Sequence, residues 1–408
     1  MLLKRFIDFF TSLRLTVVCL AFATLLVFIG TLAQVDLGLY NAQNQFFRSF
    51  FIWWGPKGAD WKIPVFPGGY TLGAILLANL LAAHAKRFKL TKKKTGIFMI
   101  HAGIILLLVG QFATDRLSTE SYMRLVAQEE GKNYSESSLS TELAIIDKSD
   151  PDHDEVVSIP ARLLQRRGEI RDPRLPFAVR VQQFFVNSHL RQRGPVVDGP
   201  VPDSVKGVGR EFKFEQAPPV VKMDGQNTPA ATVEIVSERG TEGVWHVSNW
   251  ATDISSVLWL ERKQLVSATQ LQALTAPQRF EYKSKTYEIA LRPLRYYKPF
   301  TIELLQFTHA KYRGTDTPKD FTSRIRLANP KTGEDREVKI YMNNPLRYGG
   351  ETFYQGSFDQ FDPRVSILQV VRNPSWLTPY FAVTIVGLGL LVQFLSHLIP
   401  FAKKRMSA

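Results

Sequence analysis

Four long apolar segments stand out along the chain, each bordered by polar or basic residues. A helix of about 20 apolar residues can span the hydrocarbon core of a bilayer. The second segment is strongly apolar over only about fifteen residues, and it spans the core if the stems of Lys86 and Arg87 extend to the interface. We therefore expect a multi-pass membrane protein with four transmembrane α-helices, at residues 15–33, 70–84, 96–113 and 377–399.

The stretch between the third and fourth apolar segments has the pattern of β-structure. Short runs alternate apolar and polar residues, as at 231–236 and 324–327, and turn residues separate the runs. Gly333 predicts a hairpin turn, and Ser267–Leu274 predicts a helix that a proline ends. We therefore expect a large β-rich, sandwich-like domain at residues 115–376.

An internal similarity lies inside this β-rich stretch. Residues 176–184 and 299–307 both open with Pro-Phe, continue as an alternating strand and end in Gln-Phe. Two related halves of the domain would explain the similarity. The same pattern also arises if Pro-Phe simply suits the start of a β-strand, and both interpretations stay open.

The predicted organisation therefore has three regions. Residues 1–114 hold three transmembrane helices and a short outer loop at 35–68. Residues 115–376 form the β-rich domain. Residues 377–408 hold the fourth transmembrane helix and a basic tail.

The formal net charge of +14 would suit a nucleic-acid partner, but its distribution does not. Basic residues cluster before the first apolar segment, between the second and third, and after the fourth; the clusters begin at Lys4, Lys86 and Lys403. Basic residues beside transmembrane helices mark their cytoplasmic ends. Both termini are thus expected in the cytoplasm and the β-rich domain on the exported side of a bacterial inner membrane, with no nucleic-acid partner.

The first apolar segment could instead be a cleaved signal peptide. However, Thr31–Gln34 makes a weak cleavage site. Removal of the first apolar segment would also leave a number of membrane crossings that does not put all the basic clusters on the same side. We expect an uncleaved membrane anchor.

Composition also limits the chemistry. Cys19 is the only cysteine, so an intrachain disulfide, a CxxC redox motif and a cysteine-rich zinc site are excluded. The order of residues shows no catalytic Ser-His-Asp triad, phosphate-binding loop or dinucleotide-binding fingerprint.

His101 is the strongest candidate for a functional residue. It lies inside the third apolar segment, about 8 Å along the helix from its start. An ionisable side chain at such a position is costly and marks a functional site by default. A neutral imidazole is a good axial ligand for haem iron, although it could also hydrogen-bond a neighbouring helix as a packing contact.

Five segments of the sequence match those of a known family: residues 13–18, 29–32, 79–81, 100–110 and, most specifically, 342–355. Through these segments the sequence resembles the ResB family of cytochrome c biogenesis proteins. A tryptophan-rich haem-binding motif, which that family's partner subunit carries, is not matched by Trp53, Trp54 or Trp61.

This resemblance implies a function. With a CcsA-type (ResC) partner, ResB proteins move or hold haem b across the inner membrane and position apocytochrome c for thioether attachment. His101 stands where the family has a transmembrane haem ligand, and the partner would supply the opposing axial histidine. The chain would then be a subunit of a haem lyase rather than a complete enzyme.

Other residues are weaker candidates. His84 and His397 end the second and fourth apolar segments on the same side as His101, and they are either further haem ligands or ordinary interface residues. In the β-rich domain, Arg347, Tyr348 and His309 are candidates for partner or substrate contacts. The remaining histidines have no metal-ligand spacing and are expected in surface or structural roles: His153, His189 and His246.

Two alternative functions remain at this stage. The chain could be a membrane-anchored scaffold or chaperone that binds apocytochrome, or another exported protein, without touching haem. It could also be the exported-domain subunit of an unrelated transporter.

Overall fold

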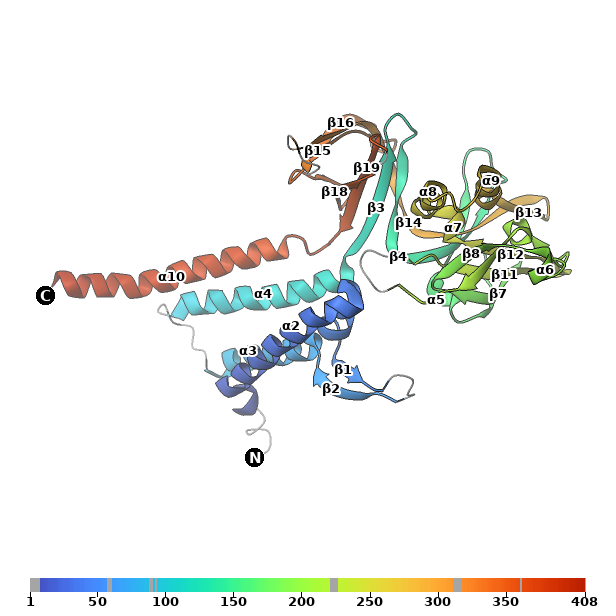
Figure 1. Ribbon diagram of the computed structural model, residues 1–408. Helices are drawn as coiled ribbons and strands as arrows, with labels where there is room; N and C mark the ends of the chain where they lie inside the picture. Colours follow the sequence, from blue (N-terminus) through green and yellow to red (C-terminus); the bar gives the residue numbers. More distant parts are fainter. Residues whose placement is uncertain are drawn as a thin grey trace. The chain divides into compact units, whose positions relative to one another are not determined.

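The computed structural model describes residues 8–56, 61–87, 91, 94–220, 227–311, 314, 318–359 and 362–407 (Figure 1). Two compact units make up the chain. The helical unit contains Met1–Thr119 and Arg372–Ala408, and the β-rich unit contains Glu120–Val220 and Gln226–Val371. Of the basic residues used to orient the chain, Lys4, Lys89, Lys92 and Lys93, with Arg5, lie outside the described residues.

The helical unit consists mainly of long helices that follow the apolar segments. Ser12 starts the first one, because its hydroxyl accepts a hydrogen bond from the backbone N–H of Arg14. A short π-helix, η1 (Gln43–Phe47), and a two-stranded hairpin of β1 (Phe51–Trp54) and β2 (Ile63–Pro67) follow it. The helices are α2 (Leu13–Ala42), α3 (Gly69–Arg87), α4 (Thr95–Leu117) and α10 (Thr378–Met406).

Among the described residues, three stretches are long and apolar enough to cross a membrane. They are Leu13–Phe47, Thr95–Leu117 and Thr378–Met406, and they correspond to the first, third and fourth predicted helices. The second predicted helix forms as α3, but α3 does not meet the same criterion of length and hydropathy. Three apolar helices and a large β-rich domain are thus confirmed, and a fourth crossing stays a prediction.

Glycines allow α4 and α10 to pack closely against each other. Gly96, Gly103 and Gly110 are seven residues apart and share one face of α4. An added Cβ at Gly103 would stand 2.8 Å from the carbonyl oxygen of Ala382, so the two backbones approach closely. Small residues permit such close packing of membrane helices.

A polar contact joins α3 to the start of α2. The buried Asn79 donates hydrogen bonds to the carbonyl oxygens of Phe10 and Ser12 and accepts one from Thr16 at 2.7 Å. A buried amide needs partners of this kind, because an unpaired polar group in an apolar setting is costly. Asn79 therefore fixes α3 against the N-terminal end of α2.

The β-rich unit contains a ten-stranded, a five-stranded and a two-stranded sheet. The ten-stranded sheet runs β16-β15-β14-β4-β3-β19-β18-β17, with β13 paired to β14 and β5 to β4; the five-stranded sheet runs β6-β7-β11-β12-β9, and β10 pairs with β8. The strands are β3 (Thr119–Val126), β4 (Lys132–Asp147), β5 (Glu155–Pro160), β6 (Gly168–Ile170), β7 (Ala178–Phe185), β8 (Ser188–Gln192), β9 (Val205–Lys206), β10 (Phe212–Gln216), β11 (Ala230–Ser237), β12 (Gly240–Ser248), β13 (Gln278–Tyr282), β14 (Lys285–Lys311), β15 (Pro318–Asn329), β16 (Glu334–Tyr341), β17 (Leu346–Tyr348), β18 (Glu351–Phe358) and β19 (Val365–Arg372).

Short helices connect these strands. The helix predicted at Ser267–Leu274 forms as α9, and Ser267 caps it together with Gln270 in a reciprocal capping box. The helices are α5 (Ala161–Leu164), α6 (Pro195–Asp198), η3 (Gly207–Arg210), α7 (Asn249–Thr252), α8 (Ile254–Arg262) and α9 (Ala268–Thr275).

The long strand β14 links two hydrophobic cores. Leu291 belongs to a core shared by the five-stranded sheet and strands β4, β5, β13 and β14. Ile302, later on the same strand, belongs to a core formed with β3 and β15–β19. The two similar segments of the sequence fall in different sheets, on β7 and β14, so their origin as related halves stays a prediction.

The hairpin that Gly333 predicts is present, and so is a turn at Gly349-Gly350, where the paired glycines of the sequence are also typical of a turn. Gly333 has a φ of 68° in the turn between β15 and β16. Gly349 and Gly350, with φ of 60° and 77°, connect β17 to β18. Two positive φ angles are typical of the tight turn that matches the twist of a hairpin.

Candidate functional site

His84 on α3 and His101 on α4 lie in direct contact. The Nδ1 atom of His101 is 2.9 Å from Nε2 of His84. The ring centroids are 4.6 Å apart and the ring planes are nearly perpendicular, at 81°. Both side chains are only half-buried within the unit. Two residues that are 17 positions apart in the sequence thus form one polar site between two apolar helices.

The glycine face of α4 explains this pairing. Gly103 faces α10, and His101 precedes it by two residues, which is about 200° around the helix at 100° per residue. His101 therefore lies on the side of α4 away from α10 and toward α3. His84 sits in the last turn of α3, where its ring also lies 6.4 Å from that of Phe98.

The proton of the His84 ring can be placed from its other contact. Nδ1 of His84 is 2.8 Å from the carbonyl oxygen of Leu80, one turn earlier on α3. A carbonyl oxygen can only accept, so Nδ1 of His84 carries the proton. In the neutral ring, Nε2 of His84 then has a lone pair that faces Nδ1 of His101.

His397 is not brought to this pair. Its Nε2 accepts a hydrogen bond from the side-chain nitrogen of Gln393 at 2.7 Å, within α10. Gln393 packs against Gly96, on the glycine face of α4, whereas His101 lies on the opposite face. Among the described residues, the structure unites two of the three predicted histidines and leaves the third on the other side of α4.

A second polar cluster lies at the other end of α3 and α4, and sequence reasoning missed it. Tyr70 and Arg48 both contact the carboxylate of Asp115, which is only 9% exposed. The guanidinium of Arg116 stacks over the Tyr70 ring at 5.1 Å. The signal in the sequence that could have indicated this cluster is the charged residues directly beside apolar segments. Their contacts join the residues after α2 to α3 and α4.

In the β-rich unit, His309 lies among aromatic rings. Its ring stacks on Phe321, with centroids 4.8 Å apart, and lies 4.4 Å from the ring of Phe358. Its Nε2 atom is buried without a hydrogen-bond partner. A buried imidazole nitrogen in this state is unusual, which keeps His309 a candidate for contact with a ligand or partner.

The other histidines of the unit have structural surroundings. His153 pairs with Asp150 at 3.2 Å on the surface, and His189 is exposed on β8. Burial lowers the pKa of His246 to about 4, with a further contribution from the positive charges of Arg193 and Lys213. His246 therefore stays neutral under ordinary conditions.

Arg347 and Tyr348 lie on β17, in the segment that carries the family resemblance. The Tyr348 hydroxyl accepts a hydrogen bond from Asn329 at 2.8 Å, and its ring meets Phe300 edge-on. Arg347 is exposed. Tyr348 thus has a packing role in the hairpin, and contact of either residue with a partner or substrate stays a prediction.

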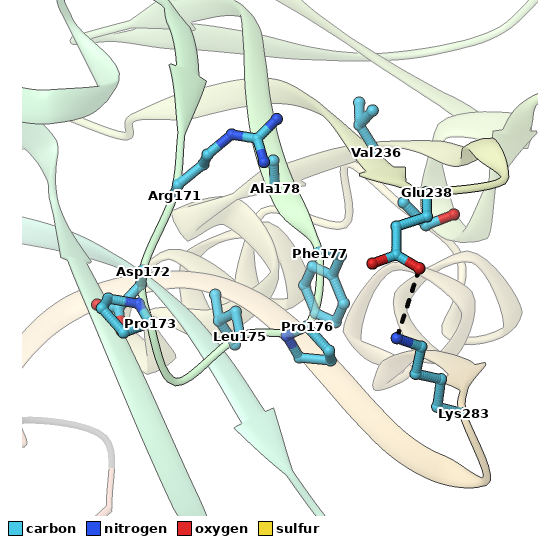
Figure 2. A pocket seen from close by; sticks show the side chains of 11 residues that line it. Arg171, Asp172, Pro173, Leu175, Pro176, Phe177, Ala178, Val236, Glu238 and Lys283 are labelled. Atoms are coloured by element: carbon cyan, nitrogen blue, oxygen red, sulfur yellow. Dashed lines mark ion pairs between the residues drawn. The ribbon is translucent and has the colours of Figure 1, made fainter.

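One pocket of the β-rich unit measures about 560 Å³, and the residues that line it do not include these histidines (Figure 2). Figure 2 shows Lys283 facing Glu238 across its rim, with a nitrogen–oxygen distance of 3.9 Å. Within the described residues, no group of three or more His, Cys, Asp or Glu side chains is arranged to hold a metal ion. The pocket is lined by Arg171, Asp172, Pro173, Leu175, Pro176, Phe177, Ala178, Val236, Ser237, Glu238 and Lys283.

Comparison with known proteins gives two matches. Residues 269–373, from α9 to the end of the β-rich unit, match the model of the ResB-like family. Protein NrfI of Wolinella succinogenes is 33% identical over 108 residues, which is 26% of this chain but only 12% of that relative. The 342–355 segment lies inside the family match, and His101 lies outside it. These matches confirm the resemblance to the ResB family, with the ResB-like part of the chain at residues 269–373.

Proposed function

We propose that the chain acts in cytochrome c biogenesis as a haem-handling membrane subunit. In this proposal it holds haem b, or passes it across the bacterial inner membrane, while apocytochrome c is positioned for thioether attachment. The ResB-like match supports the biological role. The contact between His84 and His101 is the observation that carries the haem-binding part.

The surroundings of the pair favour a function over a packing contact. Imidazoles among apolar helices lose hydration, so they are retained where they bind or transfer something. Tyr70 of α3 already donates a hydrogen bond to Asp115 of α4 at the other end of these two helices, so the histidines are not the only polar contact that joins them. A neutral imidazole nitrogen suits haem iron. The residues present thus fit haem as a cargo.

The proposed arrangement in the membrane has four crossings. The 19 residues of α3 extend about 28 Å as a helix, close to the thickness of the hydrocarbon core. Lys86 lies in the last turn of α3, Lys94 precedes α4, and Lys403 lies near the end of α10. The positive-inside rule then places these ends and both termini in the cytoplasm, and the β-rich unit on the exported side.

The division of labour follows from the residues present. His101 would bind iron from one side of the haem, and a CcsA/ResC-type partner would supply the opposite ligand. The β-rich unit would hold the apocytochrome near the partner, with His309, Arg347 and Tyr348 as candidate contacts. The bond-forming chemistry belongs to the haem vinyl groups and the cysteine thiols of the apocytochrome. The chain would therefore be a lyase subunit rather than the whole enzyme.

The test is the visible spectrum of the full chain purified with its CcsA-type partner. The native complex should show a Soret band, which weakens in His101→Ala and returns when imidazole is added. An unchanged band in His101→Ala would move the iron ligand elsewhere. A colourless native complex would favour the haem-free scaffold instead.

A further inference from the structure

We infer that His84 is a positioning residue: it accepts a hydrogen bond from Nδ1 of His101 and thereby makes Nε2 of His101 the iron-binding atom. The inference rests on the proposed function, and it assigns separate roles to two histidines that the sequence offers as equivalent candidates. Its basis is two consecutive hydrogen bonds, one between Leu80 and His84 and one between His84 and His101.

The direction of both hydrogen bonds follows from the carbonyl group of Leu80. The Leu80 carbonyl oxygen can only accept, so His84 donates to it from Nδ1. The neutral His84 ring then has only Nε2 left as an acceptor. Nδ1 of His101, 2.9 Å away, must carry the proton for a hydrogen bond to form. The neutral His101 ring is thereby left with its lone pair on Nε2.

The apolar setting favours this neutral arrangement. If His84 carried a positive charge, it would donate from both nitrogens, and His101 would have its proton on Nε2, which then could not bind iron. An unpaired charge between apolar helices costs several kcal/mol in order of magnitude, whereas two neutral rings satisfy each other. Among the described residues, Nε2 of His101 makes no hydrogen bond, so it is available to a ligand.

The same geometry argues against both histidines binding one iron. Two nitrogens on opposite sides of a metal stand about 4 Å apart, twice a metal–imidazole bond of about 2 Å. The facing nitrogens of His84 and His101 are 2.9 Å apart, which is a hydrogen-bond distance with no room for a metal between them. His84 would have to leave its contacts with Leu80 and His101 to become the second ligand.

A hydrogen bond to the outer nitrogen of a metal-binding imidazole has measurable effects. It fixes the tautomer and the ring orientation, and it raises the electron donation of the ligand. Loss of such a partner typically weakens metal binding by about 10–100-fold. Weaker donation also favours the ferrous form, so the reduction potential of the bound haem should rise.

Matched substitutions of His84 separate positioning from ligation. The full chain is prepared with its CcsA-type partner and titrated with ferric haem, and the haem affinity and midpoint reduction potential are measured. His84→Gln keeps an acceptor oxygen within reach of His101, while His84→Leu has similar bulk and no acceptor. We expect His84→Leu to bind haem about 10–100-fold more weakly and at a raised potential, and His84→Gln to stay close to the native values.

The outcomes distinguish this inference from the proposed function. If His101→Ala binds haem like the native chain, the proposed function fails. If His101→Ala loses haem but His84→Leu behaves as native, the proposed function stands and the positioning role is wrong. If His84→Gln is as damaging as His84→Leu while remaining folded by size-exclusion chromatography, His84 binds iron itself and the inference is overturned.

Discussion

Gly103 of α4 and Val386 of α10 are packed so closely that a Cβ on Gly103 would stand 2.5 Å from Cγ2 of Val386. Gly387, the next residue on α10, has open space in the same position. Overpacking a close contact costs about 1–3 kcal/mol. Gly103→Ala should therefore lower the thermal unfolding temperature of the detergent-solubilised protein, while Gly387→Ala should not lower it, because alanine is the better helix former. Equal effects of both substitutions would contradict the close packing of α4 on α10.

A buried ion pair gives a second prediction. Arg292 on β14 and Glu142 on β4 are joined at 2.9 Å, and their side chains are 5% and 2% exposed. Removing one member leaves an unpaired buried charge, which typically costs about 3–5 kcal/mol. Arg292→Met should destabilise the protein by this amount, measured by denaturant unfolding, and adding Glu142→Leu should restore most of the loss. A double variant as unstable as the single one would show that the two charges do not act as a pair.

His246 predicts a pH dependence of stability. Its pKa is about 4 in the folded chain, because burial disfavours the charged ring, and about 6.5 when unfolded. As the pH falls from about 6.5 to about 4, only the unfolded state takes up the proton, so stability decreases by about 3 kcal/mol over this window. In His246→Gln the stability should depend less steeply on pH, as thermal unfolding at several pH values would show. If His246→Gln shows the same pH dependence of stability as the native chain, other groups cause that dependence.

The turn between β17 and β18 offers a matched pair of glycines. Both Gly349 and Gly350 have positive φ, so an L side chain is strained at either position by about 1–2 kcal/mol. At Gly349 an added Cβ would also stand 2.9 Å from the Phe300 ring, whereas at Gly350 it meets open space. Gly349→Ala should thus destabilise the protein more than Gly350→Ala in denaturant unfolding. The reverse order would mean that the turn differs from the one described.

Local features of the fold could be predicted from sequence because their causes are local. The apolar runs place α2, α4 and α10, and the helix predicted at Ser267–Leu274 matches α9 within one residue at each end. Positive φ at Gly333 and at the paired glycines 349 and 350 follows from the turn residues themselves. Such signals depend only on neighbours in the sequence.

The site could be predicted only in part, because it depends on how the helices face one another. His101 stands out in the sequence as an imidazole in an apolar run. Its contact with His84 depends on the rotation of α4 about its axis, which Gly103 sets by packing on α10. The buried nitrogen of His309 likewise depends on Phe321 and Phe358, which come from two other strands. Such long-range relations leave no periodic signal in the sequence.

The identity of the iron ligand is tested most directly by counting haem. The haem content per mole of complex is measured after purification with the CcsA-type partner, for the native chain, His101→Ala and the control His397→Leu. We expect His101→Ala to lose most of its haem and His397→Leu to keep it, because His397 lies on the other face of α4 from His101. Full haem content in His101→Ala, or an equal loss in His397→Leu, would contradict the assignment of His101 as the ligand.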